Sequence, residues 1–436
     1  MISQFSLMTK RRFLPLFITQ FMGAFNDNFF KTALVVMIAY GLIDSGDMRP
    51  EMLVTVAAGI FILPFVLLTP LGGDMADKFD KSRMIRIVKL VEIALVLGVY
   101  LGFMLESVSV LLLVLFSFGA QSAVFSPSKF AILPAHLGRE ELIGGNALIN
   151  TGAYLAILLG NILGTLLAVT YLGQMASGAL LLACALVGYV AARNIPPAPA
   201  PAPDLKINYN TPVEALRNLR YAYGRPDGIF TAMLCSAWFF FVGGLYLAQL
   251  PNFTSQILGA DNIVLTFFLA LFSLGVGLGG LLNNMILRSK VQATFVPYAA
   301  LGMALLSADL FFASHGYHRG GEALIDLGAF LSDASGWRIA FDFCALAVCG
   351  GLYQVPLKAI MQDRTPASHI ARTLAGSAML DATFVLLSSI IAMGMFAVGL
   401  GVAHLFIMVG ILGLPAALYS TRLTPELWAR IRKKRK

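Results

Sequence analysis

The stretch Phe13–Ile43, FLPLFITQFMGAFNDNFFKTALVVMIAYGLI, is a long apolar run with a polar centre. Such a run is long enough to cross the hydrocarbon core of a bilayer, about 30 Å thick, as a single helix. A charged side chain at that depth costs on the order of 3 kcal/mol when it faces lipid. We therefore expect the polar side chains at the centre to face protein or a water-filled cavity; they are Asn26, Asp27, Asn28 and Lys31.

The composition of the whole chain agrees with a membrane protein. The 436 residues are 58% hydrophobic and 12% charged, whereas charged residues make up about 25% of a typical soluble domain. Apolar segments of roughly 20 residues recur along the chain, and they are continuous rather than alternating, which favours helices over the strands of a membrane barrel. We expect an all-α protein that crosses the membrane many times.

Hydropathy predicts twelve membrane-spanning helices in two halves of six. They fall near residues 13–43, 50–72, 84–105, 108–134, 142–172, 174–192, 228–257, 261–287, 293–314, 338–362, 371–398 and 401–420. The expected domains are an N-terminal six-helix bundle, a cytoplasmic linker with a short helix, a C-terminal six-helix bundle and a basic cytoplasmic tail, at residues 1–192, 193–227, 228–420 and 421–436.

The predicted linker has two parts. It opens with the spacer NIPPAPAPAPD, a composition that favours an extended and semi-rigid chain. The segment TPVEALRNLRYAYG follows, and its Thr211 and Glu214 have the spacing of a capping box. We expect Thr211 to cap a short surface helix.

Basic residues gather in every second loop. The largest groups lie at residues 10–12, 78–89 and 193–225 and in the tail ARIRKKRK. Because basic loops stay on the cytoplasmic side, this pattern predicts that both termini are cytoplasmic. Topology and contact with anionic lipids account for the net charge of +8. We expect no binding of nucleic acid.

No motif indicates a metal, a cofactor or a catalytic group. The four cysteines lie in apolar segments without a CxxC pair, and the five histidines form no metal-binding pattern. The segment GVGLGG mimics a dinucleotide-binding loop, but no strand precedes it. Small residues within a membrane span instead favour close packing of helices.

The two halves resemble each other in sequence. SPSKFAILP matches VPLKAIMQD, which pairs Lys129 with Lys358, and GNALIN matches GSAMLD, which pairs Asn150 with Asp381. A duplicated helical unit is typical of secondary transporters, whose binding site lies at the interface of the repeats. The repeat therefore predicts a transporter.

The loop GGDMADKFDKSR resembles the cytoplasmic signature of the major facilitator superfamily, Gly-x-x-x-Asp-Arg/Lys-x-Gly-x-Arg/Lys. In that superfamily the carboxylate and the basic residues form a charge network that closes the cytoplasmic gate. Asp80 stands where the superfamily usually has glycine, and a plain solvated charge run is the alternative interpretation. The residues that match the signature are Gly73, Asp77, Lys78, Lys81 and Arg83.

Four motifs carry a narrower resemblance. AFNDNFFK, DKFDKSR, FSPSKFAILPAHL and GGNALINTG are similar to those of the lysophospholipid transporter family of this superfamily, especially to transporter halves that some bacteria fuse to an acyltransferase and an acyl-carrier-protein synthetase. The resemblance implies a bacterial inner-membrane flippase that moves lysophosphatidylethanolamine and related lysophospholipids from the outer to the inner leaflet. It also implies a separate acyltransferase/acyl-ACP synthetase that reacylates the product, and a monomer.

A lysophospholipid carries a phosphate, often an amine, and one acyl tail. Lys129 and Lys358 are expected to meet the phosphate, and Asp27 or Asp381 the amine. The other members of the predicted substrate-binding set, which are expected to line the same cavity, are Asn26, Asn28, Lys31, Asn146 and Asn150.

Structural roles are the alternative for these polar residues. Asp27 and Lys31 are spaced to form an ion pair along one helix. The two lysines that are expected to bind phosphate have long stems that allow the ammonium to reach the membrane surface instead. Glu92, another carboxylate in a span, is expected to pair with Lys89 or Arg86.

One other transport function remains open, and an enzyme is not expected. A facilitator of another small amphiphile, such as a drug, a siderophore or a peptide fragment, would share the fold and the gate. A membrane-embedded acyltransferase would need a His-x-x-x-x-Asp pair, in which the carboxylate orients the histidine as a base. The nearest approach to that pair is His136 with Glu141, so we expect no enzyme.

Overall fold

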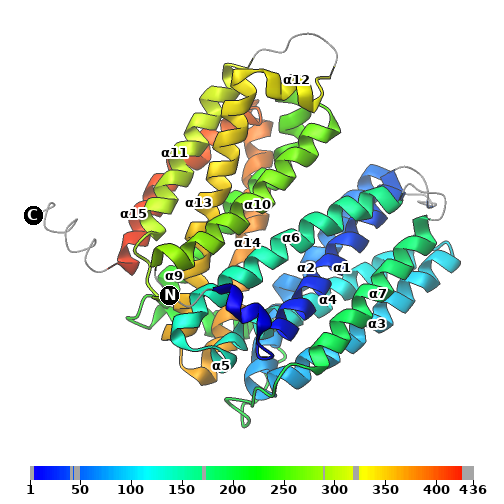
Figure 1. Ribbon diagram of the computed structural model, residues 1–436, viewed down its shortest axis with the longest axis vertical. Helices are drawn as coiled ribbons and strands as arrows, with labels where there is room; N and C mark the ends of the chain where they lie inside the picture. The colour runs from blue at the N-terminus through cyan, green and yellow to red at the C-terminus, as the bar shows by residue number, and fades with distance from the viewer. Residues whose placement is uncertain are drawn as a thin grey trace, which may run out of the picture. The chain divides into compact units, whose positions relative to one another are not determined.

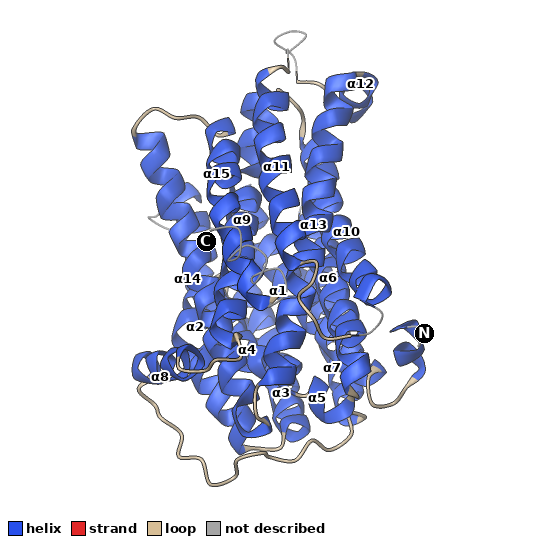
Figure 2. Cartoon of the chain, turned by 90° about the vertical axis from the view of Figure 1, so that its left-hand side faces the viewer, coloured by secondary structure: helices blue, strands red, loops and turns tan. Residues whose placement is uncertain are grey.

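A computed structural model of the chain describes residues 4–39, 43, 50–168, 173–287, 290–317 and 324–424. Within these residues the regular structure is helical, apart from one isolated bridge between Ala260 and Ile325. Figure 1 and Figure 2 show the helices from two directions. The prediction of an all-α protein is confirmed.

In the part of the chain that the structure describes, twelve long helices correspond to the twelve predicted spans (Figure 1). Eleven helices in the described residues are long and apolar enough to cross a membrane. α1 is not among them, because its four central polar residues lower its hydropathy, although its 26 residues extend about 39 Å. The bounds of the twelve are α1 Leu14–Ala39, α2 Pro50–Lys78, α3 Lys81–Met104, α4 Val108–Ala131, α6 Leu142–Ala168, α7 Gly173–Arg193, α9 Ile229–Asn252, α10 Asn262–Leu287, α11 Val296–His315, α13 Ala334–Arg364, α14 Ile370–Ala397 and α15 Ala403–Ser420.

Shorter helices connect or flank these spans. The α-helical ones are α5 Leu133–His136, α8 Thr211–Tyr223 and α12 Leu327–Ser332. Single turns of 3₁₀- or π-helix lie at Gln4–Thr9, Arg139–Glu141, Phe253–Ile257, Ala367–His369 and Thr421–Leu423.

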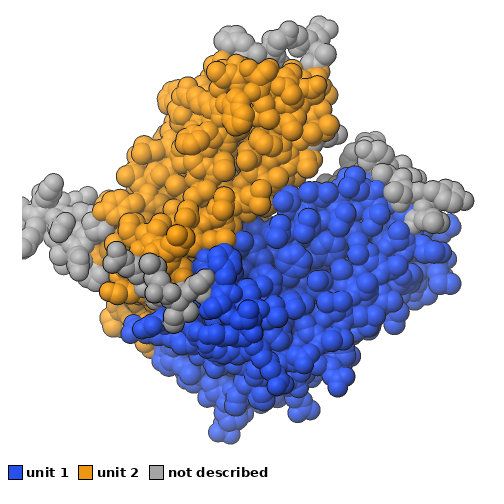
Figure 3. All heavy atoms as spheres, in the orientation of Figure 1, with its two compact units in different colours: residues 1–224, 365–379 blue, residues 225–364, 380–436 orange. Residues whose placement is uncertain are grey.

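The chain divides into two compact units, which Figure 3 shows in different colours. The first unit comprises residues 1–224 and 365–379, and the second comprises residues 225–364 and 380–436. The division falls within α14, whose residues up to 379 belong to the first unit. The domain limits expected from the sequence stay predictions.

In the first unit α1 packs against α6 and α7, and α2 packs against α4. A Cβ atom at Gly160 would lie 2.7 Å from the carbonyl oxygen of Phe25, and one at Gly164 would lie 2.7 Å from that of Phe29. These two positions on α6 therefore need glycine, because the backbone of α1 passes directly over them. The same need for small residues at close helix crossings is general in membranes.

The second unit has an equally close crossing between α10 and α13. A Cβ atom at Gly351 would lie 2.7 Å from the backbone nitrogen of Gly280 and would overlap the carbonyl oxygen of Val276. A Cβ atom at Gly279 would overlap the carbonyl oxygen of Val348. The segment GVGLGG thus lies in a helix interface.

Asp80 ends the loop between α2 and α3 and caps α3. Its backbone is extended, with φ −60° and ψ 120°, so the loop needs no glycine there. Its Oδ1 accepts hydrogen bonds from Ser82 Oγ at 2.6 Å and from the backbone nitrogen of Arg83 at 2.9 Å, and its Oδ2 accepts one from the nitrogen of Ala198 at 3.0 Å. The carboxylate thereby joins the loop to the linker.

The backbone of the linker is also hydrogen-bonded to this loop. The backbone nitrogen of Lys81 donates to the carbonyl oxygen of Ala198 at 3.0 Å, and the backbone nitrogen of Ala202 donates to the carbonyl oxygen of Asp77 at 3.0 Å. α8 then begins after Asn210, whose side chain accepts a hydrogen bond from Val213.

The prediction that Thr211 caps this helix is therefore wrong. Asn210 supplies the capping oxygen one residue earlier, and asparagine is among the strongest N-cap residues. Glu214 accepts hydrogen bonds from Asn208 and Arg217.

Replacing Asp80 by alanine should lower the stability of the protein by about 1 kcal/mol at neutral pH, because α3 loses its cap. Burial acts to raise the pKa of Asp80, but hydrogen bonds from Ser82, Arg83 and Ala198 outweigh it and lower the pKa below its ordinary 3.8. The stabilisation is thus fully present above pH about 4 and is lost as pH falls through the folded pKa. Thermal unfolding in detergent at pH 7 and pH 3 measures this difference.

The matched control for this prediction is Asp204→Ala, which removes an exposed carboxylate of the linker. It should leave the unfolding temperature unchanged at both pH values. An Asp80→Ala variant that unfolds like wild type at pH 7 would show that the cap contributes nothing.

Candidate functional site

Asp27 lies in the middle of α1 and is buried. Its Oδ2 accepts a hydrogen bond from Ser122 Oγ on α4. Its Oδ1 has no hydrogen-bond partner among the described residues. An acceptor that is buried without a donor costs about 1–3 kcal/mol, and more when it is charged. Asp27 therefore offers one oxygen to a donor that the described residues do not supply.

A buried ion pair adjoins Asp27 in the same unit. Lys89 and Glu92 of α3 pair directly, and both side chains are fully buried. Asn26 donates to Glu92 Oε1 at 2.7 Å and to the carbonyl oxygen of Leu181 at 3.2 Å. The charges of this pair act on Asp27, as does the charge of Lys129.

The expected pairing of Glu92 is thus confirmed for Lys89. Arg86, the other candidate, donates instead to the carbonyl oxygens of Ala192 and Ile195. Gly23 leaves the space for the ammonium, because a Cβ atom at this position would overlap Lys89 Nζ.

Lys31 does not form the predicted ion pair with Asp27. Its Nζ donates to Asn28 Oδ1 at 3.1 Å and lies 5.4 Å from the ring centre of Phe61. Asn28 in turn donates to the carbonyl oxygen of Ala24 at 2.9 Å. The alternative interpretation, an ion pair between Asp27 and Lys31 along α1, is therefore wrong. Asp27 accepts a hydrogen bond from Ser122, and Lys31 donates one to Asn28.

The remaining predicted residues of the first unit are on α4 and α6. Lys129 is half-buried in the last turn of α4, with its Nζ 5.2 Å from the ring centre of Phe130. Asn146 is fully buried and donates to the carbonyl oxygen of Leu142 at 2.8 Å. Asn150 is half-buried, and its Nδ2 has no partner among the described residues.

The predicted residues of the second unit, Lys358 and Asp381, form a buried ion pair. Lys358 Nζ lies 3.0 Å from Asp381 Oδ2, and the two side chains are 7% and 6% exposed. Ser236 donates to Asp381 Oδ1 at 2.9 Å and accepts a hydrogen bond from Gln354 at 3.0 Å. This burial rules out the alternative in which Lys358 reaches the membrane surface.

Asp77, of the predicted gate, binds the first turn of α14. Its carboxylate accepts hydrogen bonds from the backbone nitrogens of Ala371 and Arg372, both at 3.2 Å, and from Arg372 Nε at 3.1 Å. A helix N-terminus favours an anion at this place. A Cβ atom at Gly73 would lie 2.6 Å from that of Ala375, so glycine lets α2 approach α14.

The basic residues of the predicted gate are arranged differently. Lys81 is buried within electrostatic range of Asp77 and Asp80. The half-buried Lys78 has its Nζ 5.9 Å from the ring centre of its neighbour Phe79. Arg83 is exposed at the start of α3. The cation that binds Asp77 is therefore Arg372, which the signature does not contain.

Several polar residues of these clusters were not predicted from the sequence. Ser122, Ser236 and Gln354 are single polar residues in apolar helices, and no spacing pattern marks them. Gln20 is buried on α1 with both amide atoms unpaired among the described residues. Gln20 was predicted to share a helix face with Asp27, because it precedes Asp27 by seven residues, or two helical turns. No group of metal-binding side chains occurs in the described residues.

Relatives match the chain almost from end to end. Lysophospholipid transporter LplT of Serratia proteamaculans is 24% identical over 364 residues, or 82% of each chain. The protein of the same name from Escherichia coli is 24% identical over 427 residues, or 94% of each chain.

Solved structures of transporters share the fold. The human organic anion transporter MFSD10 (TETRAN) has a TM-score of 0.67 at 14% identity and covers 94% of this chain and 99% of its own. A bacterial homologue of the iron transporter ferroportin, in an outward-facing state, has a TM-score of 0.65 at 16% identity and covers 95% of this chain and 99% of its own. The family described as the Major Facilitator Superfamily matches residues 16–375, and the chain therefore belongs to that superfamily.

Proposed function

We propose that the protein is a lysophospholipid transporter of a bacterial inner membrane. The observation that carries this proposal is the buried Oδ1 of Asp27, which has no donor among the described residues. The ammonium of lysophosphatidylethanolamine is a donor of the required charge. Relatives that are named lysophospholipid transporters support this choice, since one of them aligns with 94% of the chain.

The phosphate of the substrate is proposed to bind the two repeat-related lysines, Lys129 and Lys358. Lys358 is paired with Asp381, so a phosphate that binds it must replace this carboxylate. Such an exchange makes the ion pair sensitive to the substrate. The other proposed contacts are those of Asn26, Asn28, Lys31, Asn146 and Asn150.

The proposed transport cycle is alternating access, with movement of the lipid from the outer to the inner leaflet. The residues proposed for the gate are Gly73, Asp77, Lys78, Lys81 and Arg83. A separate acyltransferase/acyl-ACP synthetase is proposed to reacylate the product, and the protein is proposed to act as a monomer with both termini in the cytoplasm. The protein is proposed to need no catalytic residue of its own.

Inward flipping of fluorescent lysophosphatidylethanolamine into proteoliposomes tests this function. Wild type should flip the lipid, and Asp27→Asn and Lys129→Ala should each slow flipping by about tenfold to a hundredfold. That range corresponds to the loss of one charge-assisted hydrogen bond, roughly 1.5–3 kcal/mol. The matched controls Glu140→Gln and Lys206→Ala remove exposed charges and should flip at the wild-type rate.

Two results would contradict the proposal in different ways. Wild type that does not flip lysophospholipid, but moves another amphiphile in a competition assay, would assign the fold to a different substrate. Flipping that survives in both Asp27→Asn and Lys129→Ala would keep the function and remove these two residues from the binding site.

A further inference from the structure

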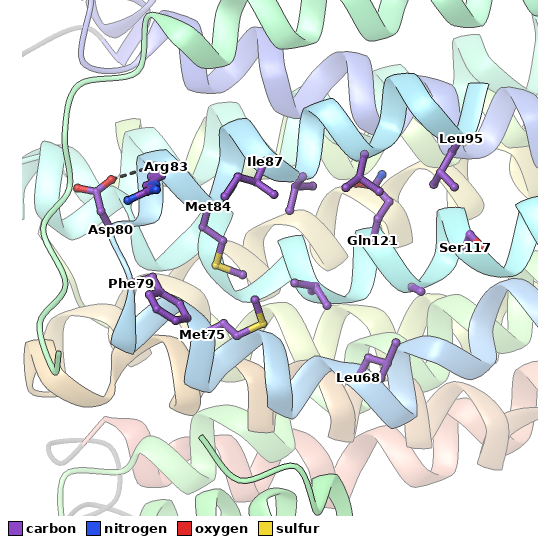
Figure 4. Close-up of a pocket in the computed structure, with 14 residues that line it drawn as sticks. Leu68, Met75, Phe79, Asp80, Arg83, Met84, Ile87, Leu95, Ser117 and Gln121 are labelled. Atoms are coloured by element: carbon purple, nitrogen blue, oxygen red, sulfur yellow. Dashed lines mark hydrogen bonds between the residues drawn. The ribbon is translucent and has the colours of Figure 1, made fainter. Parts of the chain in front are cut away.

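The first unit contains a groove between α2, α3 and α4, shown in Figure 4. Its volume is about 820 Å³, within the range of about 300–1,000 Å³ that is usual for ligand sites. No residue of the predicted substrate-binding set lines it, and of the residues proposed for the gate only Arg83 does. The groove is thus a feature that the proposed substrate-binding site does not explain.

The walls of the groove are apolar over most of their length. They include Leu68 and Met75 of α2 and Ile87, Val91 and Leu95 of α3. Ile87 and Val91 are 53% and 43% exposed, so the groove opens on the outer surface of these membrane-spanning helices. An apolar chain from the bilayer can therefore enter it sideways.

The length of the groove matches one leaflet. Its α3 wall runs from Arg83 to Leu95, and Figure 4 shows Arg83 at one end and Leu95 at the other. Twelve residues of helix rise about 18 Å, compared with about 15 Å for half of a hydrocarbon core about 30 Å thick. An acyl chain that enters at the Arg83 end can thus lie along the whole wall.

A cation is available at the mouth of the groove. Arg83 is exposed, and it takes part in none of the ion pairs found among the described residues. The neighbouring carboxylate, Asp80, is engaged by Ser82, Arg83 and Ala198, the last two through backbone nitrogens. A guanidinium is suited to bind a phosphate through two parallel hydrogen bonds.

We propose that this groove binds an anionic diacyl glycerophospholipid of the leaflet beside the α2–α3 loop. The phosphate pairs with Arg83, and one acyl chain lies between α2, α3 and α4. This lipid is a bound component of the protein and is distinct from the transported lysophospholipid. The proposal therefore holds whichever substrate the transporter moves.

Titration of the detergent-purified, delipidated protein with phosphatidylglycerol, followed by native mass spectrometry, tests the site. Wild type should retain about one lipid per chain. Arg83→Ala should weaken retention about tenfold, which equals about 1.4 kcal/mol. Val91→Trp, which fills the groove, should weaken it by a similar factor.

Matched controls separate the groove from the rest of the surface. Arg11→Ala removes another exposed arginine, and Val187→Trp adds the same bulk on α7 at a valine that is 47% exposed. Both should retain the lipid like wild type. Equal retention in all four variants, no retention by wild type, or displacement by equimolar lysophosphatidylethanolamine would overturn the proposal. The last result would assign the groove to the transport path.

Discussion

Replacing Lys358 by methionine should destabilise the protein by about 3–5 kcal/mol, because the carboxylate of Asp381 is left buried without its cation. The two side chains are 7% and 6% exposed and lie 3.0 Å apart. The hydrogen bond from Ser236 to Asp381 remains, but a hydroxyl does not neutralise the charge. Methionine keeps the length and the apolar stem of the lysine, so the change removes little besides the ammonium.

Thermal unfolding of the detergent-solubilised protein measures this effect. The double variant Lys358→Met with Asp381→Asn should recover most of the lost stability, because it removes both charges together. Lys10→Met is the matched control: Lys10 pairs with Glu141 at 3.4 Å and is 38% exposed, so it should cost at most about 1 kcal/mol. A single variant as stable as wild type, or a double variant less stable than the single, would contradict the prediction.

The second large effect is expected at the crossing of α10 and α13. Gly351→Ala should destabilise the protein by about 3 kcal/mol, the upper part of the usual range for overpacking. The added methyl group would overlap the carbonyl oxygen of Val276 and lie 2.7 Å from the nitrogen of Gly280. Both obstacles are backbone atoms, so a change of side-chain rotamer cannot relieve the overlap, and the helices must separate.

Gly394→Ala on α14 is the control for this variant, since a Cβ atom there meets nothing within 4 Å. It should leave stability unchanged or raise it by up to about 1 kcal/mol, because alanine favours a helix more than glycine does. The two substitutions are chemically identical, so their opposite signs in the same unfolding assay would isolate the helix crossing. Equal stability of both variants would show that α10 and α13 separate at no cost.

The membrane-spanning helices could be predicted from the sequence because hydropathy is a local property. Each span needs about 20 apolar residues. The polar centre of α1 is short, so the apolar residues on both sides of it still indicate one span. The start of α8 was harder. Thr211 and Asn210 are both suitable N-cap residues. The N-cap is the residue with a non-helical backbone, which is Asn210, with φ −82° and ψ 83°. The sequence does not show which of the two residues has that conformation.

The candidate site could be predicted only in part. Asp27 was predicted because a carboxylate is costly in a membrane span, and Asp381 because the internal repeat pairs it with Asn150. The pairing of Lys358 with Asp381 spans 23 residues and joins two helices, so no local spacing could reveal it. Ser122 was not predicted, because serine occurs widely in membrane helices. The partner of Asp77 was missed for a similar reason, since Arg372 belongs to a different helix.

The contact between Asp77 and α14 bears on how the chain is synthesised. Asp77 precedes Ala371, one of its hydrogen-bond donors, by 294 residues. At about 5–20 residues per second, a ribosome takes roughly 15–60 s to supply that donor. During this interval the carboxylate of Asp77 lacks the partners that it has in the finished protein. Lys81, four residues later and within electrostatic range, is a cation that the nascent chain already contains.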